Sequence, residues 1–479
     1  MKKQTLACVL ALLPFLNGWS CVFDIGSRWE LFVDADLIEY AKGAVLKLHT
    51  PVKREVVLVM DQPWEGETGA YVSAVQDGSK VLLYYRGSAR LKSDADERQV
   101  TCVAESTDGI LFTRPKLGLI EAAGTKENNV ILAGRVSHNF AVFLDANPAV
   151  QENARFKALG GVKDDGKGPA GERSGGLFAF SSADGIHWRK LCEKPVLTQG
   201  AFDSQNLAFW DSARERYACY SRCMNKGVRA IQSSFSTNFL SWSAPIANQY
   251  EDDAPVEHFY TSATLPCPTA PHVLLAFPMR FLPHRKKIET HSVGGASDAV
   301  FMSSRNGMFW SRCFLEAWIR PGPDAKNWTD RNTMPAYGIV VTAPDEWSMY
   351  ISEHYRHADN RLRRVTLRKQ GFASMYAGAT GGEFATSRLR FTGKALHLNY
   401  ATSAAGSIQI EVQDEKGEAF PGFSLDEMSP LFGDETDAIV RWKSGNDISV
   451  LRGKTVRLRV KMKDADLFAY RFGPAAENN

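Results

Sequence analysis

A short turn motif recurs along the chain and constrains its fold more than any other feature. It is clearest at 182–188 (SADGIHW) and at 304–310, with weaker copies at 106–112, 236–242 and 368–372. Asp-Gly or Asn-Gly between two apolar runs favours a tight hairpin, because both residues tolerate positive φ. The turn residues stand at 108, 184, 238, 306 and 370, so successive copies are 76, 54, 68 and 64 residues apart. Five units of about four strands each predict a five-bladed β-propeller, whose radial closure protects the sheet edges.

Short β-rich runs, separated by Gly, Asp, Asn and Pro, fill the chain between these turns. Examples are residues 81–85, 140–143, 177–180 and 273–277, whereas helical periodicity is nearly absent. A chain of 479 residues exceeds what one hydrophobic core usually organises, unless the fold is a closed repeat architecture. We therefore predict an all-β protein, with the propeller over residues 21–377.

The sequence pattern changes after Phe372. Polar and apolar side chains alternate along residues 396–400, 408–412 and 456–462, which is typical of sheets with one solvent-facing side. A C-terminal β-sandwich is predicted over residues 384–475, joined to the propeller by the Gly- and Ala-rich stretch 378–383. This domain is expected either to bind carbohydrate or to stabilise the propeller by packing against it.

The first twenty residues read as a secretory signal peptide. Lys2 and Lys3 are followed by an apolar stretch over 6–16 and a small-x-small cleavage site at 18–20. The protein is therefore expected to be secreted or periplasmic. A lipoprotein acylated at Cys21 is the alternative, which the residues before Cys21 fit less well. No later segment is long and apolar enough to be a transmembrane segment.

Charge and cysteine content exclude other classes. Lys and Arg total 57 against 54 Asp and Glu, so the balance predicts no nucleic-acid partner. The cysteines that follow the leader are scattered, without a CxxC pair or zinc spacing. We expect mostly free thiols, with one disulfide as the alternative. The oligomeric state is not predicted.

Polar or ionisable residues stand just before the first strand of each predicted blade. In a propeller that strand lines the central funnel, so these leading segments should face a shared cavity. The leading segments are residues 64–67, 137–139, 203–206, 257–260 and 330–332.

Carboxylates are the groups that cleave glycosidic bonds, and we take the catalytic candidates from three of the leading segments that carry them, 64–67, 203–206 and 257–260. One carboxylic acid protonates the departing oxygen, and one carboxylate attacks the anomeric carbon or activates water. We assign Glu257 as general acid, Glu65 as base or nucleophile, and Asp203 as the residue that orients the acid and modulates its pKa. Glu67 competes with Glu65 for its role.

Other side chains of these segments suit sugar recognition. Aromatic rings stack on sugar faces, and amides, imidazoles and guanidinium groups bond to hydroxyls. The residues predicted to contact substrate are Trp64, Glu67, His138, Asn139, Asn206, His258, Tyr260, Arg331 and Asn332, with Glu353 and His354 near the rim.

Structural roles remain the alternative for each of these residues. A glutamate at a loop–strand junction, such as Glu65, is often only a solvated turn residue. His138 and His258 are either structural or, together with Asp203, a divalent-metal site; no metal site is assigned.

With its leader, its five blade-like units, its acidic leading segments and its trailing sandwich, the chain resembles the five-bladed propeller glycoside hydrolases. That group includes the arabinanase/xylosidase and invertase/levansucrase families. The stretch 28–38 (RWELFVDADLI) is also similar to the opening of secreted glycosidase-like propeller proteins. Relatives usually carry an Asp in the first blade, an Asp in a middle blade and a Glu further on. Asp203 and Glu257 match the last two, whereas the first blade offers Glu65 or Glu67. Asp34 and Asp36, which precede the first blade, are the alternatives.

The resemblance implies a secreted glycoside hydrolase that trims a polysaccharide or oligosaccharide. Hydrolysis requires no organic cofactor, and a structural calcium ion is compatible with the family. A non-catalytic carbohydrate-binding or surface-scaffold protein on the same fold is the alternative, because fold does not fix function.

Overall fold

The computed structural model describes residues 22–88, 99–162 and 175–475. The predicted leader (residues 1–20) and Cys21 lie outside the described residues. Strands dominate the described ranges, and the helices there are short 3-10 turns: η1 (Arg135–His138), η2 (Glu152–Ala154), η4 (Ala325–Trp328), η5 (Leu425–Glu427) and η6 (Ser449–Leu451). None of the helices in these ranges has the length and apolar character needed to cross a bilayer. The predicted all-β class is confirmed.

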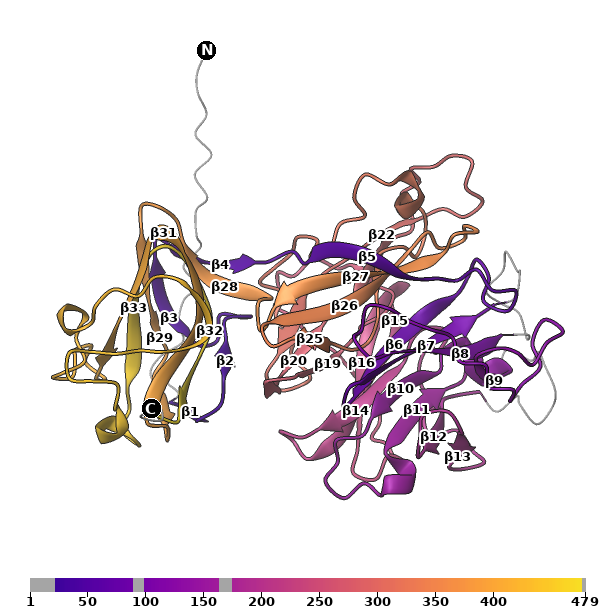
Figure 1. Ribbon diagram of the computed structural model, residues 1–479, viewed down its shortest axis with the longest axis horizontal. Coiled ribbons are helices and arrows are strands. Elements are labelled where there is room, and N and C mark those ends of the chain that lie inside the picture. The colour runs from indigo at the N-terminus through magenta and orange to yellow at the C-terminus, as the bar shows by residue number, and fades with distance from the viewer. Residues whose placement is uncertain (1–21, 89–98, 163–174, 476–479) are drawn as a thin grey trace, which may run out of the picture.

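Three four-stranded antiparallel sheets follow one another along the chain in one of the two lobes seen in Figure 1. Each sheet is built from consecutive strands, and the β-branched and aromatic runs found in the sequence form their buried strands. The first contains β6 (Ala70–Asp77), β7 (Lys80–Gly87), β8 (Val100–Ser106) and β9 (Val130–Ala133). The second contains β10 (Ala141–Leu144), β11 (Phe156–Gly160), β12 (Phe178–Ser182) and β13 (Arg189–Lys190), and the third β14 (Leu207–Asp211), β15 (Arg216–Asn225), β16 (Val228–Ser236) and β17 (Ile246–Ala247).

The fourth unit consists of two three-stranded sheets whose strands are interleaved along the chain. They are β18 (His258–Phe259), β21 (Met279–Leu282) and β22 (Ala296–Ala299), and β19 (Leu265–Cys267), β20 (Ala270–Ala276) and β23 (Met302–Ser304). The pieces meet at Pro278, which has no N–H for the ladder. The backbone bonds Phe277 N to Ser262 O (2.9 Å) and Val300 N to Pro278 O (3.0 Å) connect them.

The fifth sheet recruits a strand from the start of the chain. Its members are β24 (Met334–Pro335), β25 (Val340–Ala343), β26 (Glu346–Glu353) and β27 (Arg361–Arg368), and β5 (Val52–Val59) pairs with β27 as the outermost strand. The fifth and first sheets also bond directly, because Ala74 N donates to Tyr337 O (2.7 Å) and Tyr337 N to Val72 O (2.9 Å). Gly338 permits this approach: a Cβ there would lie 2.0 Å from the Ala74 carbonyl oxygen.

The second lobe combines both ends of the described chain. Its sheet contains β2 (Glu30–Leu31), β3 (Ile38–Lys42), β4 (Ala44–Leu48), β28 (Ala373–Ala377), β29 (Gly382–Thr386), β31 (Ala395–Gln413), β32 (Asp434–Ile439) and β33 (Arg457–Gly473), and beside it β1 (Phe23–Gly26) pairs with β30 (Leu389–Phe391). The lobe encloses its own apolar core. Figure 1 shows β4 and β28, which pair with each other, running between the two lobes.

These pairings differ from the predicted domain boundaries. Residues 23–48 and 373–377, placed in the propeller by sequence, pair with strands of the C-terminal lobe. The partners are more than 300 residues apart, as in Ala44 opposite Ala377. Local alternation shows that a segment is a strand, but it does not reveal such distant partners.

The repeated turns share one hydrogen-bond pattern. In four copies a serine Oγ accepts from the backbone N–H three residues later at 2.9 Å, the donors being Gly109, Gly185, Phe239 and Gly307. The Asp or Asn side chain accepts from the next two N–H groups, as Asp184 Oδ1 does from Ile186 and His187. Trp188 and Trp242 donate their indole N–H back to the turn at 3.0 Å. Asp184 and Trp188 therefore stabilise the turn to which they belong.

The fifth copy of the motif has another role. Gln370 has a φ of 61° and lies where the chain leaves β27 for β28. The turn therefore directs the chain out of the fifth sheet and into the second lobe.

The six cysteines in the described ranges are all free thiols: Cys102, Cys192, Cys219, Cys223, Cys267 and Cys313. Burial raises the pKa of the Cys219 thiol and that of Cys267, the latter to about 11. The expectation of mostly free thiols holds for this part of the chain.

Candidate functional site

The predicted leading segments meet through hydrogen bonds between sheets. Gln205 Nε2 donates to the Val72 carbonyl (2.8 Å), Ser204 Oγ to the Tyr260 carbonyl (2.6 Å) and Ser297 Oγ to the Asn332 carbonyl (2.7 Å). These bonds join the third sheet to the first and fourth, and the fourth to the fifth. Side chains that are far apart in sequence are thereby gathered into one region.

A group of arginines and tyrosines occupies this region, and we call it the arginine–tyrosine cluster. It comprises Tyr71, Arg86, Arg222, Arg229, Tyr260, Arg331 and Tyr355. The Tyr260 ring lies 4.9 Å from the guanidinium carbon of Arg222, 5.2 Å from that of Arg331 and 5.5 Å from that of Arg229. Cation–π contacts of this kind hold the guanidinium groups against aromatic faces.

Tyr71 and Tyr355 complete the cluster beside the first sheet. The guanidinium carbon of Arg86 lies 4.7 Å from the centre of the Tyr71 ring. The Tyr355 hydroxyl accepts hydrogen bonds from Arg86 Nη2 and Arg331 Nη1, both at 3.2 Å. Burial, and then the neighbouring Tyr260, raise the pKa of Tyr71 well above its usual range. The Tyr71 side chain is therefore a neutral phenol, and it donates to the Asp203 carbonyl (3.3 Å).

Backbone strain is concentrated at the cluster. Tyr71 and Arg331 both adopt left-handed backbone conformations, with φ of 55° and 59°. Bulky residues rarely hold such angles, and the strain is typical of functional sites, where the surrounding structure enforces it.

His138 and Asp203 flank the cluster. The His138 ring centroid lies 5.7 Å from that of Tyr71, and its Nδ1 lies 2.9 Å from Gln99 Oε1. The Asp203 carboxylate forms an ion pair with Arg222, and its side chain is 67% exposed. This carboxylate therefore lies beside a guanidinium group and is accessible to a ligand.

Glu67 lies at the edge of the same region. Its backbone carbonyl accepts from Arg356 N (2.8 Å), and the carbonyl of the next residue, Thr68, accepts from Arg86 Nη2 (2.7 Å). The side chain is half-buried, and its carboxylate contacts no cation among the residues that the structure describes. Of the two competing first-blade acids, Glu67 is the accessible one.

Glu65 is enclosed instead of facing the cluster. Its side chain is fully buried and accepts from Tyr85 Oη (2.6 Å), Arg114 Nε (2.8 Å) and Arg114 Nη2 (3.0 Å). Trp64 packs in the same apolar core and donates to Asn129 Oδ1 (2.8 Å). A carboxylate so enclosed has no exposed oxygen for a substrate, so this geometry gives Glu65 and Trp64 structural roles.

Glu257 is held by two guanidinium groups. Arg280 Nη1 and Arg312 Nη2 donate to it at 2.9 and 2.6 Å. Both carboxylate oxygens are thereby engaged by arginines, so neither is free to protonate a departing oxygen. The neighbouring His258 accepts at Nδ1 from Arg229 N (3.3 Å), and burial, followed by Arg229, lowers its pKa. His258 is therefore a neutral imidazole at the edge of the cluster.

The three predicted asparagines bond to backbone. Asn139 Nδ2 donates to the carbonyls of Gly161 and Phe202, and Asn206 Nδ2 to those of Phe202 and Ser204. Asn332 Oδ1 accepts from Tyr355 N (2.8 Å). All three are buried, and they shape the loops that carry the cluster.

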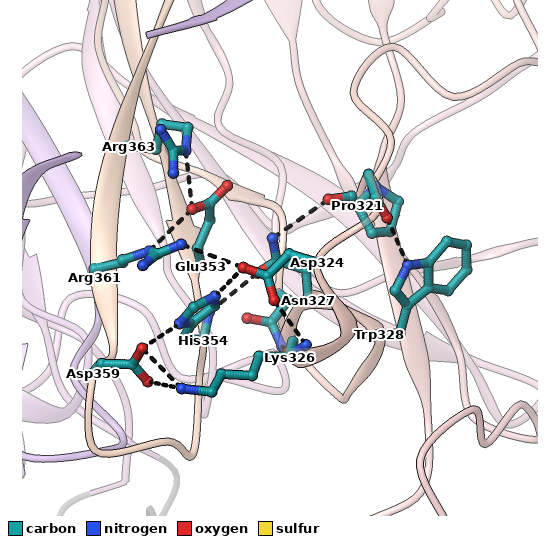
Figure 2. A network of polar contacts seen from close by, with 12 residues as sticks. Pro321, Asp324, Lys326, Asn327, Trp328, Glu353, His354, Asp359, Arg361 and Arg363 are labelled. Atoms are coloured by element: carbon teal, nitrogen blue, oxygen red, sulfur yellow. Dashed lines mark hydrogen bonds and ion pairs between the residues drawn. The ribbon is translucent and has the colours of Figure 1, made fainter. Parts of the chain in front are cut away.

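Glu353 and His354 belong to a separate network, shown in Figure 2. The Glu353 carboxylate pairs with Arg361 Nε (3.2 Å) and Arg363 Nε (2.9 Å). The His354 ring lies between two carboxylates, with Asp324 at 2.7 Å and Asp359 at 2.8 Å. Both residues are buried, so the network fixes the end of β26 instead of presenting groups to a ligand.

Sequence reasoning missed most of the cluster. Tyr71, Arg86, Arg222 and Arg229 lie within β6, β7, β15 and β16, not in the leading segments. A usable signal was present for Arg86, since a cation directly after the apolar run 81–85 is unusual on a buried strand. The described residues contain no group of three or more His, Cys, Asp or Glu side chains suited to a metal ion.

Comparisons with known proteins find likeness only at the level of structure. No family model and no curated protein matches the chain. Similar solved structures include a glycoside hydrolase (11% identity, TM-score 0.44, covering 67% of this chain and 92% of that one). A glycosyl hydrolase from Bacteroides ovatus is also similar (10% identity, TM-score 0.38, 71% and 93% covered). A third is described with the GH130 mannoside phosphorylase family, which contains glycoside hydrolases that target β-1,2 mannosidic linkages (12% identity, TM-score 0.35, 74% and 95% covered). These structural neighbours are glycoside hydrolases, the class named by the sequence resemblance.

Proposed function

We propose that the protein is a secreted glycoside hydrolase whose substrate binds at the arginine–tyrosine cluster. We further infer that its five sheet units are the blades of a five-bladed propeller and that the second lobe is a β-sandwich. One observation carries the proposal: all five units contribute side chains to one region that combines aromatic rings with hydrogen-bonding groups. Such a combination suits a sugar, which offers both apolar ring faces and hydroxyls.

Two accessible carboxylates supply the chemistry in this proposal. Asp203, which lies beside Arg222, acts as the base or nucleophile. Glu67, which has no cation partner in the described ranges, donates the proton to the departing oxygen. Glu65 and Glu257 act structurally, because arginines already occupy their carboxylates.

A carbohydrate-binding protein without turnover is the second candidate. The arginine pairs that hold Glu65 and Glu257 favour it, since two of the three predicted catalytic acids are engaged elsewhere. Turnover by the purified protein distinguishes the two candidates.

The test is a screen of the mature protein against aryl glycosides and plant and algal polysaccharides, followed by variants of the two acids. Asp203→Asn and Glu67→Gln are each expected to lower kcat by at least about 100-fold, within the range of general acid–base contributions. Glu55→Gln is the matched control, because Glu55 is also an exposed acid paired with a buried arginine, Arg364. Full activity in both site variants would exclude this assignment, and binding without turnover across the panel would favour the second candidate.

A further inference from the structure

We infer that the substrate carries a negative charge, and that the arginine–tyrosine cluster binds a carboxylate or sulfate group on a sugar. This inference rests on the proposed function, since it names the substrate class of the same site. The inference follows from the number of arginines at the cluster that have no carboxylate partner among the described residues.

Arg86 is the first cation without a carboxylate. Its side chain is almost completely buried, and it contacts the Thr68 carbonyl at 2.7 Å, the Tyr355 hydroxyl at 3.2 Å and His138 Nδ1 at 3.4 Å, none of which is a carboxylate. Its Nε has no partner in the described ranges. A buried charge is costly unless it is paired, so an anion at this position would be strongly favoured.

Arg229 is the second such cation. Its polar partner is the neutral His258 ring, and its guanidinium carbon lies 5.5 Å from the Tyr260 ring centre and 5.4 Å from that of Phe281. Burial, and then the charge of Arg222, lower its pKa. Repulsion between the two guanidinium groups would be relieved by an anion bound between them.

Arg222 has a carboxylate partner, but an exposed one. Asp203 contacts this guanidinium through Nη2, and Nε has no partner in the described ranges, so an anion can bind Arg222 while Asp203 keeps its place. Arg222 itself is fixed by burial and by the Tyr260 ring. Guanidinium groups bind carboxylate and sulfate oxygens in pairs of parallel hydrogen bonds. The tyrosine rings at the same place supply the apolar faces on which a sugar ring rests.

The experiment compares binding of three oligosaccharides of equal length by calorimetry: galacturonate oligomers, sulfated galactan and neutral galactan. At least one of the two acidic ligands is expected to bind about tenfold or more tightly than the neutral one, and to weaken as salt is raised. The acidic ligand that is preferred identifies the anion as carboxylate or sulfate.

Variants then test the cluster itself. Arg229→Gln is expected to weaken acidic-ligand binding about tenfold more than it weakens neutral-ligand binding, and Arg229→Lys to recover part of that difference. Arg216→Gln is the matched control, because Arg216 is also half-buried and stacks on an aromatic ring (Phe235), yet lies at the opposite end of β15 from Arg222. Thermal melts confirm that both variants fold.

Equal binding of neutral and acidic ligands, or equal affinities of Arg229→Gln and the unaltered protein, would overturn the inference. A separate measurement of turnover distinguishes the proposed hydrolase activity from the proposed preference for a charged substrate. Cleavage without any preference for charge would overturn this inference alone, whereas tight binding of an acidic glycan without cleavage would overturn only the proposed function.

Discussion

Replacing Glu65 by alanine tests whether this residue is structural or catalytic. The substitution removes a fully buried carboxylate that accepts from Tyr85 Oη at 2.6 Å, Arg114 Nε at 2.8 Å and Arg114 Nη2 at 3.0 Å. Breaking a buried ion pair from one side costs about 3–5 kcal/mol of unfolding free energy, because the other charge stays behind. Arg114 is 25% exposed and keeps Asp61 at 3.4 Å, so we expect the lower end, about 3 kcal/mol.

This loss is large enough to measure by thermal unfolding. We take the first lobe, about 320 residues, as one cooperative unit with an unfolding entropy of about 2.1 cal/mol/K per residue. The Tm should then fall by about 4 °C. Glu55→Ala is the control, because the partly exposed pair with Arg364 should cost less than about 1 kcal/mol. Adding Arg114→Leu to Glu65→Ala should recover part of the loss, since no unpaired charge then remains.

Turnover gives the decisive comparison for the same variant. If Glu65 is structural, the folded Glu65→Ala protein keeps its kcat while its Tm falls. If instead the Tm is unchanged and kcat drops by more than about 100-fold, a size typical of lost acid–base catalysis, then Glu65 reaches the substrate and the structural reasoning is wrong.

Two further predictions concern stability. Burial acts to raise the pKa of the fully buried Glu30, but the hydrogen bond from His272 and the charge of Arg305 outweigh it and bring the pKa to about 2. This pKa lies below the unfolded value of 4.5, so a stabilisation of about 3 kcal/mol is present above pH 4.5 and is lost as the pH falls toward 2. Glu30→Gln should therefore flatten the dependence of Tm on pH over that window. An unchanged slope would contradict the assignment. Trp188 contacts the Phe140 ring edge-on at 4.9 Å and donates to its own turn. Trp188→Ala should therefore lower the free energy of unfolding by about 2–3 kcal/mol. Urea unfolding measures that loss, Trp188→Phe should recover most of it, and equal effects of the two substitutions would argue against ring packing.

The sequence predicts the local elements well because their causes are local. Serine and Asp or Asn two residues apart bond to the backbone of their own turn, so the spacing around Asp184 is enough to locate a hairpin. The buried runs, such as 81–85 in β7, are likewise apparent from composition. The same reasoning cannot show that β5 completes the fifth sheet or that β4 joins β28, because those pairings depend on side chains more than 300 residues away.

The sequence predicts which segments lie near the candidate site, but it does not predict how their carboxylates are paired, and the reason is the position of the arginines. A leading segment tells where a carboxylate lies along the chain, not which cation is folded against it. Glu65 and Glu257 were therefore indistinguishable from Asp203 by sequence, although Arg114 encloses one and Arg280 with Arg312 hold the other. Of the three acids first assigned to catalysis (Glu65, Asp203 and Glu257), Asp203 alone has both a place beside the cluster and an exposed carboxylate.

The distribution of charge inside the first lobe follows from the same pairing. Arginines from the surrounding elements neutralise the acids Glu65, Glu257 and Glu353 away from the cluster, whereas Arg86 and Arg229 lie at the cluster without an acid of their own among the described residues. The nearly balanced formal charge of +3 therefore conceals a local excess of positive charge, counted over the described residues, where the five units meet. Because a half-buried guanidinium attracts anions far more strongly than an exposed one does, this local excess should govern which ligands reach the site, even though the protein as a whole is almost neutral.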